Sequence, residues 1–242
     1  MRGIKAIKKT SLVIIIFNSI IILCLFGYIL FNKYSEKDPI DIFNMNVNSI
    51  VEVKAVTDSV GESYGTGVIY DSSGLLITNS HVISYTSLGE TKTFDEYEIR
   101  FATKEDYQSA TLIKYDVEID LAILKINDES VKYDSVEFSN KNYSYGDKVY
   151  AIGNTSNYGI GISEGIISVP EVNIKYDNIS RLVIQSNIDI SSGNSGGALL
   201  NDKGQLIGIT TFRTKDNQGN VNYGFAYSIP LKTIKRIIRE IK

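Results

Sequence analysis

The longest apolar run of the chain lies close to its N-terminus. Residues 12–31 read LVIIIFNSIIILCLFGYILF and contain no charged side chain. A helix of this length spans about 30 Å, the thickness of the hydrocarbon core of a bilayer. Four basic residues stand within the first nine positions, and basic residues beside a span remain on the cytoplasmic side. We therefore expect a cytoplasmic tail over 1–11, a single-pass anchor in the cell membrane over 12–31, and an extracytoplasmic remainder.

A cleaved signal peptide is the competing interpretation of residues 12–31. The apolar part of a signal peptide is usually shorter and ends at small residues, and this run does not follow that pattern. Leu23 before Cys24 also departs from a lipoprotein cleavage site, where a small residue precedes the cysteine. The retained anchor is the favoured interpretation. Because Cys24 is the one cysteine of the chain, the protein has no internal disulfide.

Beyond the anchor, the pattern changes from a polar linker over 32–47 to short apolar runs separated by turn residues. Residues 96–101 alternate between charged and apolar side chains, which is typical of a half-buried strand. The runs at 67–70 and 75–78 flank Asp-Ser-Ser-Gly, which predicts a hairpin. Many short strands at roughly ten-residue spacing predict an all-β sandwich or barrel.

One helix is predicted in the soluble part, at residues 230–242. Pro230 suits a first helical turn, where a missing N–H group costs nothing. Leucine and isoleucine then recur at helical spacing, and lysine and arginine occupy the other side. A basic amphipathic helix of this kind is able to lie on a membrane surface. Packing of its apolar stripe against a β-barrel is the favoured alternative.

Composition narrows the chemistry. The net charge of −3 offers no broad basic field, so nucleic acid is not expected as a partner. No cluster of cysteine and histidine suits a metal ion, and no cofactor is expected. The chain has a single histidine, His81, which follows an apolar run. By itself such a histidine is more often structural than catalytic.

Three residues together change this picture. Asp120 stands inside an apolar run, where a carboxylate is costly unless donors meet it. Ser195 stands between Gly193 and Gly197, and by itself this pattern is equally typical of a turn. A serine hydroxyl needs a base to become a nucleophile, histidine suits that task, and a carboxylate orients the imidazole. Glycines beside the serine allow backbone N–H groups to converge on an oxyanion.

Chain order distinguishes the classes of serine hydrolase. In α/β-hydrolases the histidine follows the serine, and no histidine follows Ser195. The subtilisin order needs an acid before His81, and the aspartates found there have no suitable setting. The remaining order, histidine then aspartate then serine, is the chymotrypsin-type order. It also agrees with the predicted β-structure.

Three blocks of sequence, GTGVIYDSSGLLITNSHVI, IDLAILKI and GNSGGALLNDKGQLIGI, resemble those of the HtrA/Deg group of trypsin-like serine proteases. The resemblance extends from about residue 49 to 242. It implies a protease domain over 48–242 made of two six-stranded β-barrels, at about 48–135 and 136–229, with the active site between them.

The resemblance also implies roles for individual residues. His81 and Asp120 belong to the first barrel and Ser195 to the second, as the catalytic triad. The oxyanion hole is expected at Gly193, Asn194 and Ser195, with the backbone N–H groups of Gly193 and Ser195 as donors.

The specificity pocket is expected at Asp189, Ile190, Thr210 and Thr211. Asp189 lies six residues before the serine, the offset at which enzymes that cleave after lysine or arginine carry an aspartate. Ile190 is typical of relatives that prefer small aliphatic side chains. The sequence leaves three alternatives open: a basic preference, an aliphatic preference, and an Asp189 that bonds at the surface.

The function expected from these features is that of a membrane-anchored serine endopeptidase, which acts on polypeptides in protein quality control or processing outside the cytoplasm. Many relatives carry PDZ domains after the protease domain, whereas this chain stops at the helix, so regulation through PDZ domains is not expected. The resemblance also suggests a homotrimer. Two alternatives stay open: a catalytically silent binding module with the protease fold, and a serine hydrolase that is not a protease.

Overall fold

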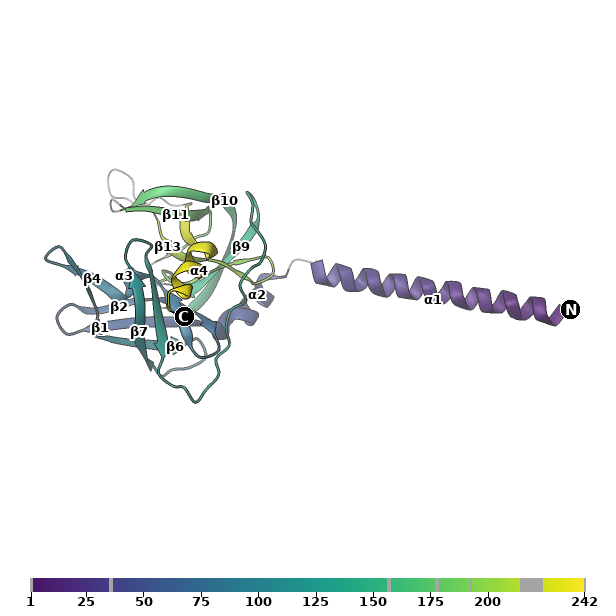
Figure 1. Cartoon of the computed structure of the whole chain (residues 1–242), viewed down its shortest axis with the longest axis horizontal. Helices are drawn as coiled ribbons and strands as arrows, with labels where there is room; N and C mark the ends of the chain where they lie inside the picture. The colour runs from purple at the N-terminus through teal and green to yellow at the C-terminus, as the bar shows by residue number, and fades with distance from the viewer. Residues whose placement is uncertain are drawn as a thin grey trace. The chain divides into compact units, whose positions relative to one another are not determined.

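The computed structural model describes residues 2–34, 37–155, 158–176, 179–191, 193–213 and 224–241 (Figure 1). The chain divides into two units, Met1–Glu36 and Lys37–Lys242. Each unit is considered by itself.

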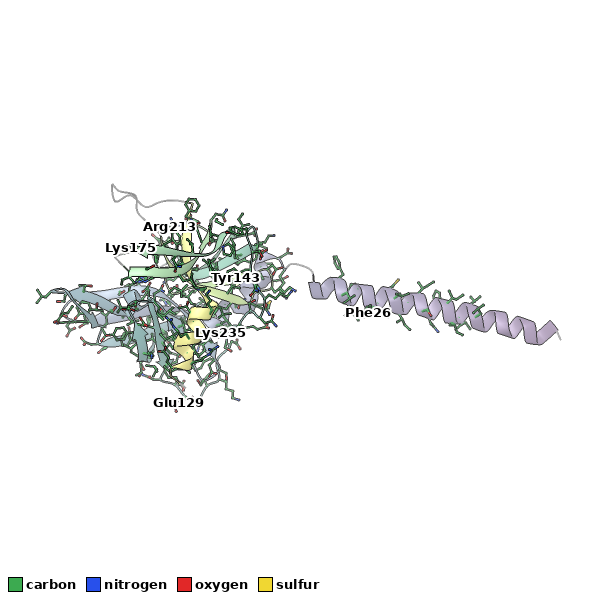
Figure 2. All side chains as sticks on the ribbon, turned by 45° about the horizontal axis from the view of Figure 1, so that its top comes forward. Phe26, Glu129, Tyr143, Lys175, Arg213 and Lys235 are labelled. Atoms are coloured by element: carbon green, nitrogen blue, oxygen red, sulfur yellow. The ribbon has the colours of Figure 1, made fainter. Side chains whose placement is uncertain are left out.

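The first unit is a single helix, α1 (Arg2–Tyr34). Within it, residues Leu12–Phe31 are long and apolar enough to cross a membrane, and none of them is buried. Figure 2 shows side chains, Phe26 among them, projecting from opposite edges of this helix. An apolar surface around the whole circumference suits a lipid environment. Its length and composition fit both a membrane anchor and a signal sequence.

The second unit begins with α2 (Pro39–Asn46) and a short 3₁₀ turn, η1 (Val47–Ser49). Ile42 is fully buried in the core, and the Asn46 amide donates a hydrogen bond to the Ile42 carbonyl. Residues 39–46, which fall within the polar linker expected over 32–47, form this helix instead. An eight-residue helix with one buried isoleucine is too short for its periodicity to be visible in the sequence.

Barrel one closes in the order β1-β2-β3-β8-β7-β6. Its strands are β1 (Ile50–Thr57), β2 (Gly61–Asp71), β3 (Leu75–Thr78), β6 (Glu96–Phe101), β7 (Gln108–Asp116) and β8 (Leu121–Ile126). In β6 exposed or half-buried residues alternate with buried ones, as the sequence predicts. Two further strands, β4 (Ser84–Ser87) and β5 (Glu90–Thr93), form a separate hairpin.

Barrel two closes in the order β10-β11-β14-β13-β12-β9. Its strands are β9 (Lys148–Asn154), β10 (Ile160–Tyr176), β11 (Ile179–Ser186), β12 (Ala198–Asn201), β13 (Leu206–Phe212) and β14 (Ala226–Pro230). The two barrels lie one beside the other in the folded unit (Figure 1). The prediction of two six-stranded barrels is confirmed.

The last helix, α4 (Leu231–Arg239), lies between the barrels and contacts β13, β14 and β8 (Figure 1). Its leucine and isoleucine stripe is buried, at Leu231, Ile234, Ile237 and Ile238. These side chains join a core cluster that contains residues of both barrels. The helix therefore uses its apolar face to hold the two barrels together, in agreement with the favoured interpretation of the sequence.

Candidate functional site

His81 lies on a single helical turn, α3 (Ser80–Ile83), directly after β3. The flanking residues Ser80 and Val82 are buried, whereas the His81 side chain is 49% exposed. The glycine at position 65 allows α3 to pack against the neighbouring strand. A Cβ atom at this position would lie 2.6 Å from a methyl carbon of Val82 and 3.0 Å from the Ser195 carbonyl oxygen. Residue 65 is thus a point where α3 and the backbone of Ser195 meet.

Asp120 ends the acid turn, residues 117–120, which connects β7 to β8. Its backbone is left-handed, with φ of 56°, a conformation that aspartate tolerates better than most residues. Within barrel one, the Asp116 carboxylate accepts hydrogen bonds from the N–H groups of Glu118 and Ile119. From barrel two, Arg181 donates to the carbonyls of Val117 and Glu118, at 2.9 and 2.8 Å. The turn is therefore held from both barrels.

The Asp120 carboxylate faces His81. Its Oδ2 and Oδ1 atoms lie 2.9 and 3.0 Å from the imidazole Nδ1. Three further donors reach the carboxylate: the His81 N–H group at 3.1 Å, the Ser80 hydroxyl at 2.9 Å and the Thr211 hydroxyl at 2.6 Å. Burial raises the pKa of Asp120. His81 lowers it more strongly, through its hydrogen bonds and its charge, and the hydrogen bond from the Thr211 hydroxyl adds to this effect. The pKa of Asp120 therefore lies below its ordinary value. The group is an anion at neutral pH.

Ser195 lies in the serine loop, residues 193–197, which precedes β12. Gly193 and Gly196 have left-handed backbones, with φ of 93° and 86°. At Gly196 a Cβ atom would also lie 2.0 Å from the Thr66 carbonyl oxygen. Only glycine fits this position, because the loop passes so close to β2 of the other barrel.

The Ser195 hydroxyl donates a hydrogen bond to the Thr211 carbonyl at 2.8 Å. Thr211 is also the residue whose own hydroxyl bonds to Asp120. Serine and aspartate therefore contact the same residue, and His81 contacts the aspartate, so the fold brings all three to one junction between the barrels. In this conformation the Ser195 hydroxyl donates to the Thr211 carbonyl rather than to the His81 ring.

The backbone N–H groups of Gly193 and Ser195 have no hydrogen-bond acceptor in the part of the chain that the structure describes. The Asn194 N–H group, by contrast, donates to the Ser191 carbonyl at 3.1 Å. The Asn194 side chain is buried, with its amide between the Asn154 carbonyl and the Ser191 N–H group, each at 3.2 Å. Asn194 is thus engaged on both sides, which leaves Gly193 and Ser195 as the available donors.

The residues expected in the specificity pocket lie in different settings. The Asp189 side chain is 88% exposed and forms an ion pair with Arg213, which Figure 2 labels at the upper side of the folded unit. This arrangement matches the third alternative left open by the sequence, an Asp189 that bonds at the surface, and does not match a buried carboxylate. Ile190 is buried in the core of barrel two.

Two other residues of that expected pocket act on the loop and on the acid. The Thr210 hydroxyl donates to the Asn194 carbonyl at 2.6 Å, and the Thr211 hydroxyl donates to Asp120. Sequence reasoning also missed Thr66 and Arg181, which reach the serine loop and the acid turn from the opposite barrel. Thr66 stands inside one of the three sequence blocks, but nothing in the sequence indicates its contact. Among the described residues, no group of three or more histidine, cysteine or acidic side chains is placed to hold a metal ion.

Comparison with known proteins agrees with this geometry. The model of a family described as "Trypsin-like peptidase domain" matches residues 65–209. The "Probable periplasmic serine endoprotease DegP-like" of Rickettsia conorii is 36% identical over 223 residues, which cover 87% of this chain and 41% of that protein. The "Serine endoprotease DegS" of Haemophilus influenzae is 33% identical over 178 residues, which cover 73% of this chain and 49% of that protein. The chain thus spans less than half the length of these two relatives.

Solved structures give the same result. The structure "HtrA-type protease AlgW with tripeptide" superimposes with a TM-score of 0.71 at 26% identity, covering 85% of this chain and 64% of that one. A serine endoprotease from Yersinia pestis gives a TM-score of 0.67 at 25% identity, covering 86% of this chain and 67% of that one.

Proposed function

The chain is an HtrA/Deg-like member of the trypsin-like peptidase family, and from this premise we propose that it is a membrane-anchored serine endopeptidase. His81, Asp120 and Ser195 are its catalytic residues. The observation that carries the proposal is the continuous contact from the imidazole through Asp120 and Thr211 to the Ser195 hydroxyl. Such a set needs neither a metal ion nor a cofactor to hydrolyse a peptide bond.

Catalysis begins when the Ser195 hydroxyl turns from the Thr211 carbonyl to the unprotonated nitrogen of the His81 ring. That nitrogen takes the hydroxyl proton while the serine oxygen bonds to the carbonyl carbon of the substrate. The charge on the substrate oxygen is met by the N–H groups of Gly193 and Ser195, which have no acceptor among the described residues. His81 passes the proton to the leaving amine, and water then releases the acyl group by the same steps.

Asp120 supports both halves of this cycle. Its carboxylate accepts from Nδ1 and so leaves the opposite ring nitrogen free to receive the serine proton. It also stabilises the imidazolium that forms. Because the pKa of Asp120 is held below its ordinary value, the carboxylate keeps its charge throughout the neutral range.

The proposed substrates are polypeptides cleaved after small aliphatic residues. Asp189 is paired with Arg213 at the surface and offers no buried carboxylate for a lysine or arginine side chain. In a peptide library we expect cleavage after alanine or valine to exceed cleavage after lysine or arginine. The Asp189→Asn variant should keep this preference. A strong preference for basic residues that disappears in Asp189→Asn would contradict the assignment.

The proposed location is the membrane, with residues 12–31 as the anchor, the N-terminus in the cytoplasm and the catalytic unit outside it. The apolar circumference of α1 supports the anchor, and basic residues before it support the orientation. Assembly into a homo-oligomer is proposed from family membership alone. A catalytically silent binding module is the alternative to the enzymatic proposal.

A fluorophosphonate probe distinguishes these possibilities, because it reacts only with a serine that a base activates. We expect the full-length chain in detergent to be labelled at Ser195, as mapped by mass spectrometry, and to hydrolyse both casein and a simple ester. Labelling should be absent in Ser195→Ala and retained in Ser191→Ala, a matched change four positions before Ser195. An unlabelled wild type would favour the silent module. Labelling with ester but no casein hydrolysis would favour a hydrolase that is not a protease.

A further inference from the structure

We infer that two buried threonines, Thr66 of β2 and Thr210 of β13, are positioning residues that orient the backbone of the serine loop so that the Ser195 N–H group stays free for an oxyanion. One threonine comes from each barrel. The catalytic consequence of this arrangement rests on the proposed function, whereas the restraint on the loop itself does not.

Thr66 holds two carbonyls of the loop. Its hydroxyl donates to the Gly193 carbonyl at 2.7 Å, and its N–H group donates to the Ser195 carbonyl at 2.8 Å. The same hydroxyl oxygen accepts from the Asn154 N–H group at 2.8 Å, and the Thr66 carbonyl accepts from the Thr78 hydroxyl at 2.7 Å. Thr66 is fully buried, so its polar groups are satisfied by protein partners rather than by water.

Thr210 holds the carbonyl between those two. Its hydroxyl donates to the Asn194 carbonyl at 2.6 Å, which also accepts from the Gly197 N–H group at 2.9 Å. The backbone of Thr210 contributes as well, because its carbonyl accepts from the Gly196 N–H group at 2.9 Å. Thr210 is likewise buried. Three successive carbonyls of the loop are therefore bonded to these two threonines.

Of the three peptides whose carbonyls the threonines hold, one keeps its N–H group available for a ligand. In a trans peptide the N–H group points away from the carbonyl, so fixing a carbonyl also fixes the N–H group of the next residue. The peptides that follow Gly193 and Ser195 are bonded at both ends, since the N–H groups of Asn194 and Gly196 have acceptors. The peptide that follows Asn194 is bonded at its carbonyl alone. Its N–H group belongs to Ser195 and has no acceptor within the described ranges.

Two kinds of substitution, each made at both threonines, distinguish a residue that positions the loop from one that only fills space. Thr66→Val and Thr210→Val fill the same volume but lack the hydroxyl donor, whereas Thr66→Ser and Thr210→Ser keep the donor and lose a methyl group. A residue that only fills space is better replaced by valine. A residue that positions the loop is better replaced by serine.

For the full-length enzyme we expect Thr66→Val to lower kcat by roughly 10- to 100-fold with little change in KM, because the loss falls on the transition state. Affinity for a peptide boronic acid, whose tetrahedral adduct places an oxygen at the loop N–H groups, should fall by a similar factor. Affinity for a cleaved product peptide should be unchanged. Thr66→Ser should restore kcat and boronate affinity, and the Thr210 pair should behave in the same way.

Hydrogen exchange of the segment that contains the serine loop, measured by mass spectrometry, tests the restraint without activity. It should become faster in both valine variants and stay at the wild-type rate in both serine variants. Unchanged exchange together with wild-type kcat in Thr66→Val and Thr210→Val would overturn the inference, and so would serine variants that fail to restore either property. If the wild type itself were inert toward substrate, the proposed enzymatic function would fail, and hydrogen exchange would still decide the role of the threonines.

Discussion

Replacement of His81 with alanine is expected to lower kcat/KM for a peptide substrate by about a million-fold. His81 is the one histidine of the chain, so no second imidazole is available to take the proton of Ser195. The measurement is the initial rate of hydrolysis of a chromogenic peptide by the full-length enzyme in detergent. A far-UV circular dichroism spectrum that matches the wild type will show that the variant is folded, and the loss is then attributable to chemistry.

The double variant His81→Ala/Ser195→Ala gives a sharper test of the same prediction. The rate losses from residues that act together in catalysis are not additive, because removal of one residue already disables the others. The double variant should therefore be about as slow as either single variant. Product binding should be preserved in all three. A His81→Ala enzyme that retains more than about one per cent of the wild-type rate would require a different base, and the proposed mechanism would be wrong.

The residues that carry chemistry were accessible from the sequence because their types and order are restrictive. One histidine, an aspartate in an apolar run and a serine among glycines occur in an order that few folds of serine hydrolase share. Alternation in β6 and the isoleucine spacing of α4 likewise have a physical cause, since each element buries one face. Both features involve residues that are close in the sequence, so the sequence pattern alone is enough to predict them.

Contacts between the barrels were not accessible in this way. Thr66 and Gly193 are 127 positions apart, and Arg181 and Val117 are 64 apart. Neither residue type is unusual in a strand, so no feature of the sequence marks the pair. The alternatives for Asp189 stayed open for the same reason, since its orientation depends on Arg213, 24 positions later. The orientation of such a side chain depends on a partner that is distant in the sequence and that only the folded structure brings close.

Replacement of Asp120 with asparagine is expected to lower kcat by about ten thousand-fold. Asparagine has nearly the shape of aspartate, but one of its two terminal atoms is an NH₂ group that donates. The side chain is met by the His81 N–H group and by the Ser80 and Thr211 hydroxyls, which leaves an NH₂ group facing donors or the imidazole. Where it faces Nδ1, the ring proton moves to the opposite nitrogen, which then no longer accepts from Ser195. The measurement is kcat on the same chromogenic peptide.

Asp116→Asn is the matched control, because it makes the same change in the segment that leads into the acid turn. Asp116 accepts both of its N–H bonds through one oxygen, and an amide oxygen accepts them equally well, so kcat should stay close to the wild-type value. Stability gives an independent check. The pKa of Asp120 is lowered by folding, so its stabilising contribution is complete above the ordinary aspartate pKa of about 4 and is lost as the pH falls through the folded-state pKa. The difference in melting temperature between wild type and Asp120→Asn should therefore narrow in solutions more acidic than about pH 4. A difference that widens there, or an Asp120→Asn enzyme as active as Asp116→Asn, would show that the carboxylate is not the group that orients His81.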